Sequence, residues 1–428
     1  MIHASSSARF SAGRSDLVTR RALLGGAVML AGASAMAPLL AQGTGGVGKA
    51  PPAITRGEYE ARIAKAQRLM RAAGLTALLV EAGSSLVYFT GVEWWRSERL
   101  TGAVIPASGA IAIVTPHFEE PSIRETLAIP AEVRVWQEDE DALALVAGVL
   151  RDRKAAAGPI GIEETVRYFA VDGLAKALPH ATIRSGAGVV RACRLIKSPA
   201  EIALMQHAND ITIAAYRDTY AKVEKGMTGA DIGKIMAAAQ LAHGADEADG
   251  GLVLLDEASA YPHGSHVRHE VREGMVVLMD TGCKVKGYSS DISRTFVHGE
   301  PTAAQRTMWT QMHRGQEIAF ATAQVGTPAG KVDDAVRAYY ESLGYGPGYK
   351  LPGTSHRTGH GIGLDGHEPV NLVHGETTPL APGMCFSNEP GLYRPGAFGI
   401  RLEDCFHMTE SGPKWFSVPP PSIDRPFG

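Results

Sequence analysis

The stretch Ser355–Pro369 reads SHRTGHGIGLDGHEP and places His356, His360 and His367 within twelve positions. The first two have the His-x3-His spacing that puts two imidazoles on one helix face in zinc proteases. Four glycines interrupt the stretch and Pro369 ends it, so a stable helix is not expected. We therefore expect these histidines on a loop or strand, and partners for any metal must come from elsewhere in the chain.

Carboxylates occur where buried strands normally carry aliphatic side chains. The run 275–282, MVVLMDTG, predicts an apolar strand that ends at Asp280. The run 288–296, YSSDISRTF, predicts another strand with Asp291 facing inward. An unpaired buried carboxylate costs several kcal/mol, so two of them in adjacent strands indicate a cation between them.

The same pattern returns near the C-terminus. Glu389 ends the strand predicted in 384–393, MCFSNEPGLY, and Glu403 lies in the middle of the strand predicted in 399–404, GIRLED. Four carboxylates with one histidine from the opening stretch suit Mn²⁺, Co²⁺, Fe²⁺ or Zn²⁺. Four negative charges are too many for one ion, and two divalent ions balance them.

These residues, in this order and with these neighbours, resemble the dinuclear metallopeptidases of the "pita-bread" fold, family M24. That family includes methionine aminopeptidases, Xaa-Pro aminopeptidases and Xaa-Pro dipeptidases. The resemblance covers roughly residues 57–410, and it implies two divalent ions, Mn²⁺ first, with Zn²⁺, Co²⁺ or Fe²⁺ as alternatives. The metal ligands it implies are Asp280, Asp291, His360, Glu389 and Glu403.

The proline-directed branch of the family is the closer match. Its pattern adds three histidines and an arginine, which fall here on His263, His356, His367 and Arg401. Residues 88–91, YFTG, resemble a motif of the creatinase/prolidase N-terminal domain, which methionine aminopeptidases usually lack. The resemblance therefore implies a peptide substrate with proline in second position.

The resemblance also implies catalytic roles. A metal-bridged hydroxide attacks the scissile carbonyl, with Glu389 as both ligand and proton acceptor. His356 and His367 bind the carbonyl oxygen or a substrate carboxylate, and His263 assists the leaving nitrogen. Arg401 orients a ligand carboxylate, and Tyr393 lines the same wall.

The first 45 residues differ from the rest. Arg20 and Arg21 precede an uncharged run, 22–37, rich in Ala and Gly. This resembles a twin-arginine export signal over residues 1–41 and implies a periplasmic or otherwise exported protein. A membrane anchor is the alternative, but the run falls short of the roughly 20 apolar residues that a spanning helix needs. We expect no stable membrane insertion once the signal is removed.

The remaining chain is predicted to have a linker, 42–56, and two domains, 57–190 and 191–428. Alternating elements predict an α/β first domain of the creatinase/prolidase type. A helix start at Ser198 opens the second domain, for which the resemblance implies an α+β pita-bread fold. The elements predicted in the first domain are a helix from Gly57 capped near Gly74, strands at 75–80, 103–105, 111–114 and 160–162, and a helix at 141–150.

Composition bounds the remaining possibilities. The chain is 45% hydrophobic and 20% charged with a formal net charge of −3, and it has no basic run, so nucleic acid is not an expected partner. The four cysteines are far apart and form no CxxC pair, which makes a cysteine zinc site improbable. Buried free thiols are expected, although export would permit a disulfide.

We expect an exported Xaa-Pro aminopeptidase, with an Xaa-Pro dipeptidase as the alternative. A creatinase-like hydrolase or a sulfonium lyase on the same scaffold would alter the ligands, and all five are present. The resemblance further implies a homodimer or higher homo-oligomer. Residues 93–99, EWWRSER, either place Trp95 or Arg96 near a substrate terminus or pack an interface.

Overall fold

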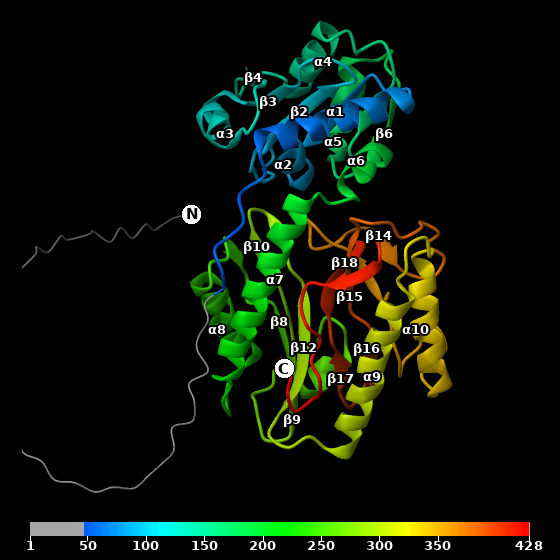
Figure 1. The fold of residues 1–428 in the computed structure, drawn as a ribbon. Helices are drawn as coiled ribbons and strands as arrows, with labels where there is room; N and C mark the ends of the chain where they lie inside the picture. The colour runs from blue at the N-terminus through cyan, green and yellow to red at the C-terminus, as the bar shows by residue number, and fades with distance from the viewer. Residues whose placement is uncertain (1–46, 428) are drawn as a thin grey trace, which may run out of the picture. The chain divides into compact units, whose positions relative to one another are not determined.

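The computed structural model describes residues 47–427, which lie in one compact unit (Figure 1). The predicted export signal, 1–41, and the first part of the linker lie outside the described residues. Within the described part of the chain, no helix is long and apolar enough to cross a membrane.

The first part is built on a six-stranded mixed sheet. Its central strand β1 (Ala77–Glu81) pairs antiparallel with β2 (Gly102–Pro106) and parallel with β5 (Ile160–Ile162). Because side chains alternate along a strand, Leu78 and Leu79 of β1 enter separate apolar clusters. The strand order is β4-β3-β2-β1-β5-β6, with β3 (Ala112–Pro116), β4 (Glu132–Trp136) and β6 (Ile183–Ser185).

Helices supply the apolar partners of these two clusters. Side chains of α1, α2 and α6 join the Leu78 cluster, and those of α4 and α5 join the Leu79 cluster. The predicted strands and helices of this domain are all present, and Gly74, with φ +69°, follows the first helix as predicted. The helical bounds are α1 (Arg56–Ala72), α2 (Ser84–Thr90), η1 (His117–Glu119), α3 (Glu120–Thr126), α4 (Ala142–Asp152), α5 (Tyr168–Ala177) and α6 (Ala187–Arg194).

The second part begins with two capped helices. Ser198 and Glu201 form the predicted capping box at the start of α7 (Pro199–Tyr220), and Thr228 caps α8 (Gly229–Ala242) in the same way. The predicted domain boundary between 190 and 191 falls inside α6. It precedes the segment that separates α6 from α7 by a few residues.

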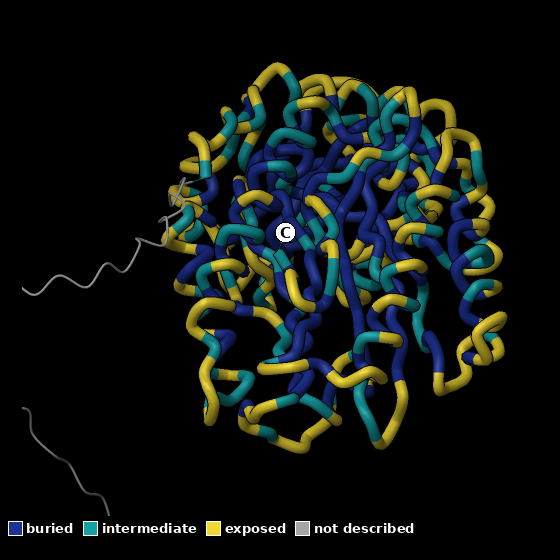
Figure 2. The backbone as a smooth tube through the Cα atoms, turned by 60° about the horizontal axis from the view of Figure 1, so that its bottom comes forward, coloured by how far each residue is buried: buried dark blue, intermediate teal, exposed yellow. Residues whose placement is uncertain are grey.

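Two antiparallel sheets, each covered by a helix pair, follow. The sheet β12-β9-β8 shares an apolar cluster with α7 and α8, and the sheet β14-β13-β15-β18-β19 contributes to another with α9 and α10. Figure 2 shows the buried segments gathered beneath exposed loops. The bounds are β8 (Leu252–Leu255), η2 (Asp256–Ala260), β9 (Met275–Thr281), β12 (Ile292–His298), α9 (Ala303–Thr322), α10 (Gly330–Ser342), β13 (Gly359–Gly361), β14 (Glu368–Leu372), β15 (Cys385–Asn388), β18 (Asp404–Thr409) and β19 (Gly412–Trp415).

Short strands connect these layers and correct two expectations. Asp291 lies between β11 and β12 and not within one continuous strand, and Glu403 lies between β17 and β18 and not in mid-strand. The chain leaves one sheet for another at Glu403, and its backbone still exchanges two hydrogen bonds with Ser293 of β12, at 3.0 and 3.3 Å. The short strands are β7 (Glu247–Ala248), β10 (Cys283–Val285), β11 (Tyr288–Ser289), β16 (Gly391–Tyr393) and β17 (Gly399–Arg401).

One apolar cluster extends across both parts. It contains Leu86 and Phe89 of α2 together with Tyr288 and Ile362 of the second part. At its edge the Arg62 guanidinium donates to the Tyr288 hydroxyl at 3.0 Å. The two parts are therefore joined by a continuous core and by buried polar contacts.

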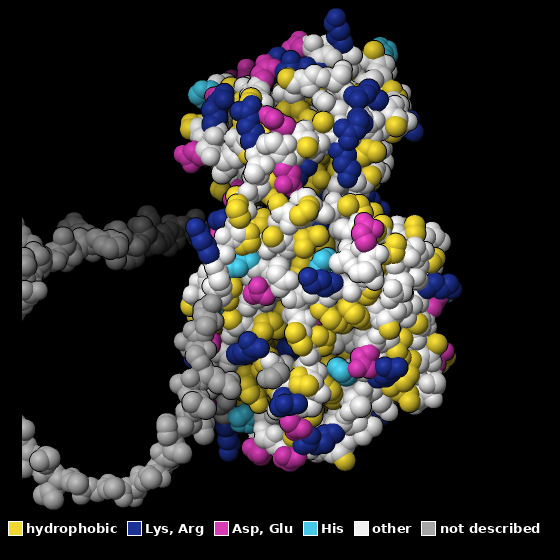
Figure 3. Space-filling view, viewed as in Figure 1, with side chains coloured by type: hydrophobic (Ala, Val, Ile, Leu, Met, Phe, Trp, Pro, Cys, Tyr) yellow, Lys and Arg dark blue, Asp and Glu magenta, His cyan; other side chains and the backbone are white. Residues whose placement is uncertain are grey.

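The surface and the cysteines add little chemistry. Figure 3 shows acidic, basic and apolar side chains interspersed on the face drawn. The four cysteine thiols are free and buried, as the sequence predicted. They are Cys193, Cys283, Cys385 and Cys405.

Candidate active site

The opening stretch forms strand and loop, as predicted from its glycines. Gly359–Gly361 is β13, and the pairing of β13 with β14 shifts register between His360 and Gly361. A register shift of this kind redirects a side chain at the point where it occurs. It presents His360 to the Asp291 and Glu389 carboxylates, which lie just beyond the ends of other strands.

The glycines serve the sheet itself. A Cβ on Gly359 would lie 2.2 Å from the Ser387 carbonyl oxygen, and one on Gly363 would meet the Glu368 carboxylate and Lys197. At these two positions, protein atoms of neighbouring segments occupy the space that a side chain would take.

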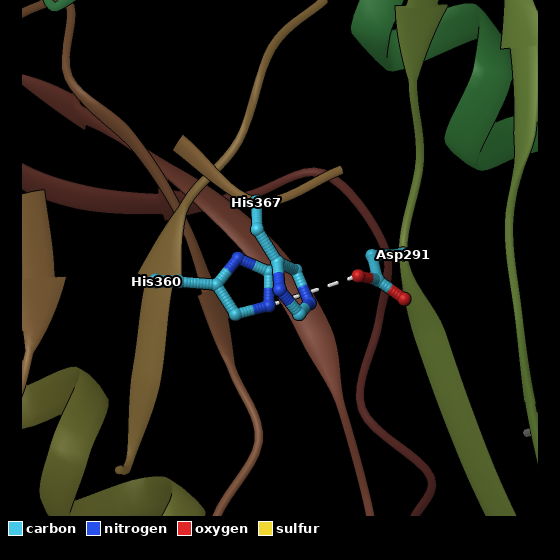
Figure 4. A group of neighbouring side chains, drawn as sticks. All are labelled: Asp291, His360 and His367. Carbon is cyan, nitrogen blue, oxygen red and sulfur yellow. Dashed lines mark ion pairs between the residues drawn. The ribbon is translucent and has the colours of Figure 1, made fainter. Parts of the chain in front are cut away.

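Figure 4 shows the imidazole of His360 directed at Asp291, with His367 beside it. The distances from His360 Nε2 are 3.2 Å to Glu389 Oε1 and 3.8 Å to Asp291 Oδ2. The other ring nitrogen, Nδ1, lies 3.0 Å from the Gly361 carbonyl oxygen and so donates its proton there. In the neutral ring this hydrogen bond fixes the tautomer whose Nε2 lone pair could bind a metal ion.

Two groups of candidate ligands share one side chain. The first is Asp280, Asp291 and Glu403, and the second is His360, Glu389 and Glu403, with the ligand atoms of each group within 4.8 Å of one another. The structure therefore brings together all five predicted metal ligands, with Glu403 common to both groups. A third group places His367 with Asp291 and His360.

Uncompensated negative charge perturbs these carboxyl groups. Burial, followed by the Asp280 charge, raises the pKa of Asp291 to about 8. Burial and the charges of Asp291 and Glu389 raise the pKa of Glu403 well above its ordinary value. Glu389 is also buried, but the hydrogen bond and charge of His360 lower its pKa to about 2. The cluster lacks the positive charge that would ionise all its members.

Glu403 gives an independent sign of a cation. It is 1% exposed, its Oε2 accepts from the Ser293 hydroxyl at 2.8 Å, and its Oε1 has no hydrogen-bond partner among the described residues. A buried carboxylate oxygen without a partner is costly. The residues present therefore fit divalent metal ions bound at this carboxylate.

Arg401 and Tyr393 hold the wall behind these carboxylates. The Arg401 guanidinium donates to Asp280 Oδ2 at 2.6 Å, to the Tyr393 hydroxyl at 2.9 Å and to Ser293 Oγ at 3.1 Å. The Tyr393 oxygen lies 2.8 Å from His356 Nε2. Since His356 Nδ1 donates to the Arg357 carbonyl, Nε2 accepts the Tyr393 proton. Both nitrogens of His356 are thus engaged within the protein.

The other two predicted histidines lie at the exposed edge of the site. His263 follows η2 in an exposed loop, and exposed His367 has its Nδ1 3.2 Å from Arg357 Nη2. Burial and the charges of His360 and Arg357 lower the pKa of His367 to about 4, so its ring is neutral at pH 7.

These groups surround one cavity of about 400 Å³. Except for Tyr393, every site residue predicted from the sequence lines it. Trp95 and Arg96 do not: Trp95 is 70% exposed and stacks on Trp94, and Arg96 donates to the Ala82 carbonyl at 2.9 Å. Within this chain, the tryptophan pair lies outside the site.

Sequence reasoning missed two polar residues of the site, Ser293 and Arg357. The signal for Ser293 is its spacing from Asp291, because residues two apart on an extended segment share a face. Arg357 lies inside the opening stretch, where the histidines drew attention away from it. Arg357 lines the cavity, and Ser293 supports the site through its hydrogen bond to Glu403.

Comparison with known proteins places this geometry in a family. Residues 203–410 match the family model described as "Metallopeptidase family M24", and residues 62–196 match "Creatinase/Prolidase N-terminal domain". The chain is 34% identical over 361 residues to the "Probable dipeptidase PepE" of Mycobacterium tuberculosis, covering 83% of this chain and 93% of that protein. This chain belongs to metallopeptidase family M24.

Solved structures and further relatives are also similar to this M24 chain over most of its length. The crystal structure of dipeptidase PepE from Mycobacterium ulcerans matches with a TM-score of 0.77 and 30% identity, over 86% of this chain and 98% of that one. The Xaa-Pro dipeptidase of Lactobacillus helveticus is 30% identical over 341 residues, 78% of this chain and 90% of that protein. The predicted family, the creatinase/prolidase-type N-terminal domain and the pita-bread catalytic domain are confirmed. The chain is a metallopeptidase of a family that uses divalent metal ions.

Proposed function

We propose that this M24 chain is a dinuclear peptidase that hydrolyses the bond between an N-terminal residue and proline, with dipeptides as the preferred substrates. The observation that carries the dinuclear centre is the pair of ligand groups that share Glu403. Support for dipeptides comes from relatives named dipeptidase and Xaa-Pro dipeptidase. From the sequence we expected an aminopeptidase, with a dipeptidase as the alternative. These relatives favour the dipeptidase.

The proposed ligands divide into two sets. Asp280 and Asp291 would hold one ion, His360 and Glu389 the other, and Glu403 would bridge them. Mn²⁺ is the proposed ion, with Zn²⁺, Co²⁺ or Fe²⁺ as alternatives. When bound, the ions supply Lewis-acid chemistry that activates water and polarises the scissile carbonyl.

The protein's own groups move the protons. Glu389 would hold an ion as a carboxylate, and in that form it is available to accept a proton from the attacking water. His367 accepts from Arg357 through Nδ1, which leaves its proton on Nε2. That N–H donor would stabilise the negative charge that develops on the carbonyl oxygen.

The remaining predicted residues have supporting roles in this proposal. His263, exposed at the cavity, would assist the leaving nitrogen. Arg401 orients Asp280, and Tyr393 connects Arg401 to His356. Because both nitrogens of His356 are engaged, a direct contact with substrate would require it to exchange one of these hydrogen bonds.

Metal analysis and peptide hydrolysis test this function. We expect the purified full chain to bind two equivalents of Mn²⁺ and to hydrolyse Ala-Pro and Gly-Pro faster than Ala-Pro-Ala. Asp291→Ala should abolish activity. Absence of bound metal, or full activity of Asp291→Ala, would contradict the mechanism. Faster cleavage of Ala-Pro-Ala would indicate an aminopeptidase, and equal cleavage of Ala-Ala would remove the requirement for proline.

We also propose export through a twin-arginine signal in residues 1–41, to the periplasm or beyond. The support is the Arg20-Arg21 pair followed by the uncharged run 22–37. Cell fractionation should find the native chain outside the cytoplasm and the Arg20→Lys/Arg21→Lys variant inside it. Equal distribution of both proteins would overturn the proposal.

A homodimer or higher homo-oligomer is proposed as the assembly. The exposed Trp95 is an apolar side chain available to such an interface. Light scattering coupled to size-exclusion chromatography measures the mass directly. A mass of one chain at micromolar concentration would contradict it.

A further inference from the structure

Two arginines line the cavity, and their hydrogen bonding differs. Arg401 is 2% exposed and donates to Asp280, Tyr393, Ser293 and the Pro262 carbonyl. Four of its five N–H donors are thus used within the protein. Its role is confined to the protein.

Arg357 is in the opposite situation. Its guanidinium makes one hydrogen bond, to the neutral ring of His367 at 3.2 Å, and it forms no ion pair with any carboxylate of residues 47–427. A guanidinium has five N–H donors in a planar fork that matches a carboxylate. Arg357 therefore presents unused donors to the cavity it lines.

The position of Arg357 separates it from the acidic cluster. His360 touches Asp291 and Glu389, the rings of His360 and His367 are 3.9 Å apart, and Arg357 follows beyond His367. The His367 imidazole thus lies between Arg357 and the candidate metal ligands. A second anion in the cavity would be repelled by the carboxylates on one side and attracted by Arg357 on the other.

A dipeptide carries an anion at a matching position. Its terminal carboxylate lies one residue beyond the scissile carbonyl, a distance of about 3.3–3.6 Å along an extended chain. If the scissile carbonyl lies over the ligand groups, the carboxylate falls about one side chain away from them. Arg357 lines the same cavity next to His367, where it can meet an anion bound beyond the ligand groups.

We propose that Arg357 binds the C-terminal carboxylate of the substrate and thereby selects dipeptides over longer peptides. This inference rests on the proposed peptidase function and adds its specificity determinant. In a longer peptide or an amide, a neutral carbonyl replaces the carboxylate, and the bidentate charged contact is lost. A hydrogen bond to a charged group corresponds to roughly 10- to 100-fold in affinity.

The test compares substrates that differ only at this end. Ala-Pro, Ala-Pro-amide and Ala-Pro-Ala are offered to the Mn²⁺-loaded full chain, to Arg357→Ala and to Arg357→Lys. We expect Arg357→Ala to lower kcat/KM for Ala-Pro by roughly 10- to 100-fold more than it lowers kcat/KM for Ala-Pro-amide, with the extra loss chiefly in KM. Arg357→Lys, which keeps the charge without the fork, should fall between them.

A matched control removes the same charge elsewhere. Arg314→Ala changes an arginine whose side chain is 58% exposed on α9 and which does not line the cavity. It should behave as the native chain on all three substrates. Thermal unfolding of each variant shows whether it is folded.

A second readout does not depend on turnover. Calorimetry should show that the native chain binds L-proline at least 10-fold more tightly than Arg357→Ala does. L-prolinamide, which lacks the carboxylate, should bind the two proteins equally. Equal losses on Ala-Pro and Ala-Pro-amide, or equal proline binding by both proteins, would overturn the proposal and leave Arg357 only a positioning residue for His367. If the native chain cleaves none of the three substrates, the proposed function fails, and proline binding still decides the role of Arg357.

Discussion

Arg401 Nη2 lies 2.6 Å from Asp280 Oδ2, and the same guanidinium reaches His356 through the hydroxyl of Tyr393. A candidate metal ligand on β9 is thereby connected to a ring in the loop before β13. Loss of a group that orients a ligand carboxylate typically lowers metal affinity by about 10- to 100-fold. Mutation can measure two contributions separately: the contact of Arg401 with Asp280, and the contact of Tyr393 with His356.

Removal of the guanidinium should weaken metal binding. We expect Arg401→Ala to lower Mn²⁺ affinity by about 10- to 100-fold, because Asp280 loses its orienting donor. Tyr393→Phe keeps the contact between Arg401 and Asp280, so it should lower kcat with little change in affinity. Calorimetric titration and steady-state kinetics measure the two effects. Identical metal affinity of Arg401→Ala and the native chain would contradict this role.

Metal binding should release protons. Burial and Asp280 raise the pKa of Asp291 to about 8, so at pH 7 this group is largely protonated in the metal-free chain. Binding requires the carboxylate, so a proton is displaced and affinity rises with pH until about pH 8. Titrations at pH 7 in buffers of different ionisation enthalpy report the number of protons released. A heat that is independent of buffer would contradict the raised pKa.

Two glycines of the opening stretch form a matched pair. A Cβ on Gly359 would lie 2.2 Å from a carbonyl oxygen, whereas nothing lies within 4 Å of one on Gly366. Gly359→Ala should lower the free energy of unfolding by about 1–3 kcal/mol, as overpacking does. Gly366→Ala should stay within about 0.5 kcal/mol of the native chain. Urea unfolding at fixed metal concentration measures both, and equal stabilities would show that β13 and β15 separate easily.

Acid should remove a contribution from Glu368. This buried carboxylate lies 3.0 Å from Lys197 and also pairs with Arg194, and despite the opposing effect of burial these charges lower its pKa to about 2. A lowered pKa contributes stability that is complete above the ordinary value near 4.5 and is lost as pH falls through about 2.

Glu368→Gln should therefore destabilise the chain by about 3 kcal/mol at pH 7 and by less than half of that at pH 3. Urea unfolding of both proteins at each pH measures the difference. The metal-site carboxylates are present in both proteins, so their own titration cancels. A difference that stays constant from pH 7 to pH 3 would contradict the lowered pKa.

The metal ligands were predictable because their signals are local. An apolar run that ends in an acid, as at Asp280, is legible without knowing which strands pair. The support of these ligands is not local: Ser293 donates to Glu403 across 110 positions, and that contact depends on the register between separate strands. For the same reason the bend at Glu403 and the sheet contacts of Gly359 emerged only from the structure.

Arg357 shows a different limit. Its position in the chain was visible beside His356, but residue type alone does not distinguish a saturated arginine from one with unused donors. That distinction depends on the hydrogen bonds that Arg357 and Arg401 make, and these can be seen only in the folded chain.

The apolar cluster shared by α2, Tyr288 and Ile362 bears on how the chain melts. A fragment that begins at Pro199 would expose this cluster to water and would leave Glu201 without the Arg62 guanidinium, 3.3 Å away. The N-terminal domain thus contributes side chains to an apolar core that the catalytic domain shares. Heating should therefore unfold both domains in one cooperative transition. Mutations in α2, which contributes no candidate metal ligand, would then reduce the amount of active enzyme without changing its chemistry.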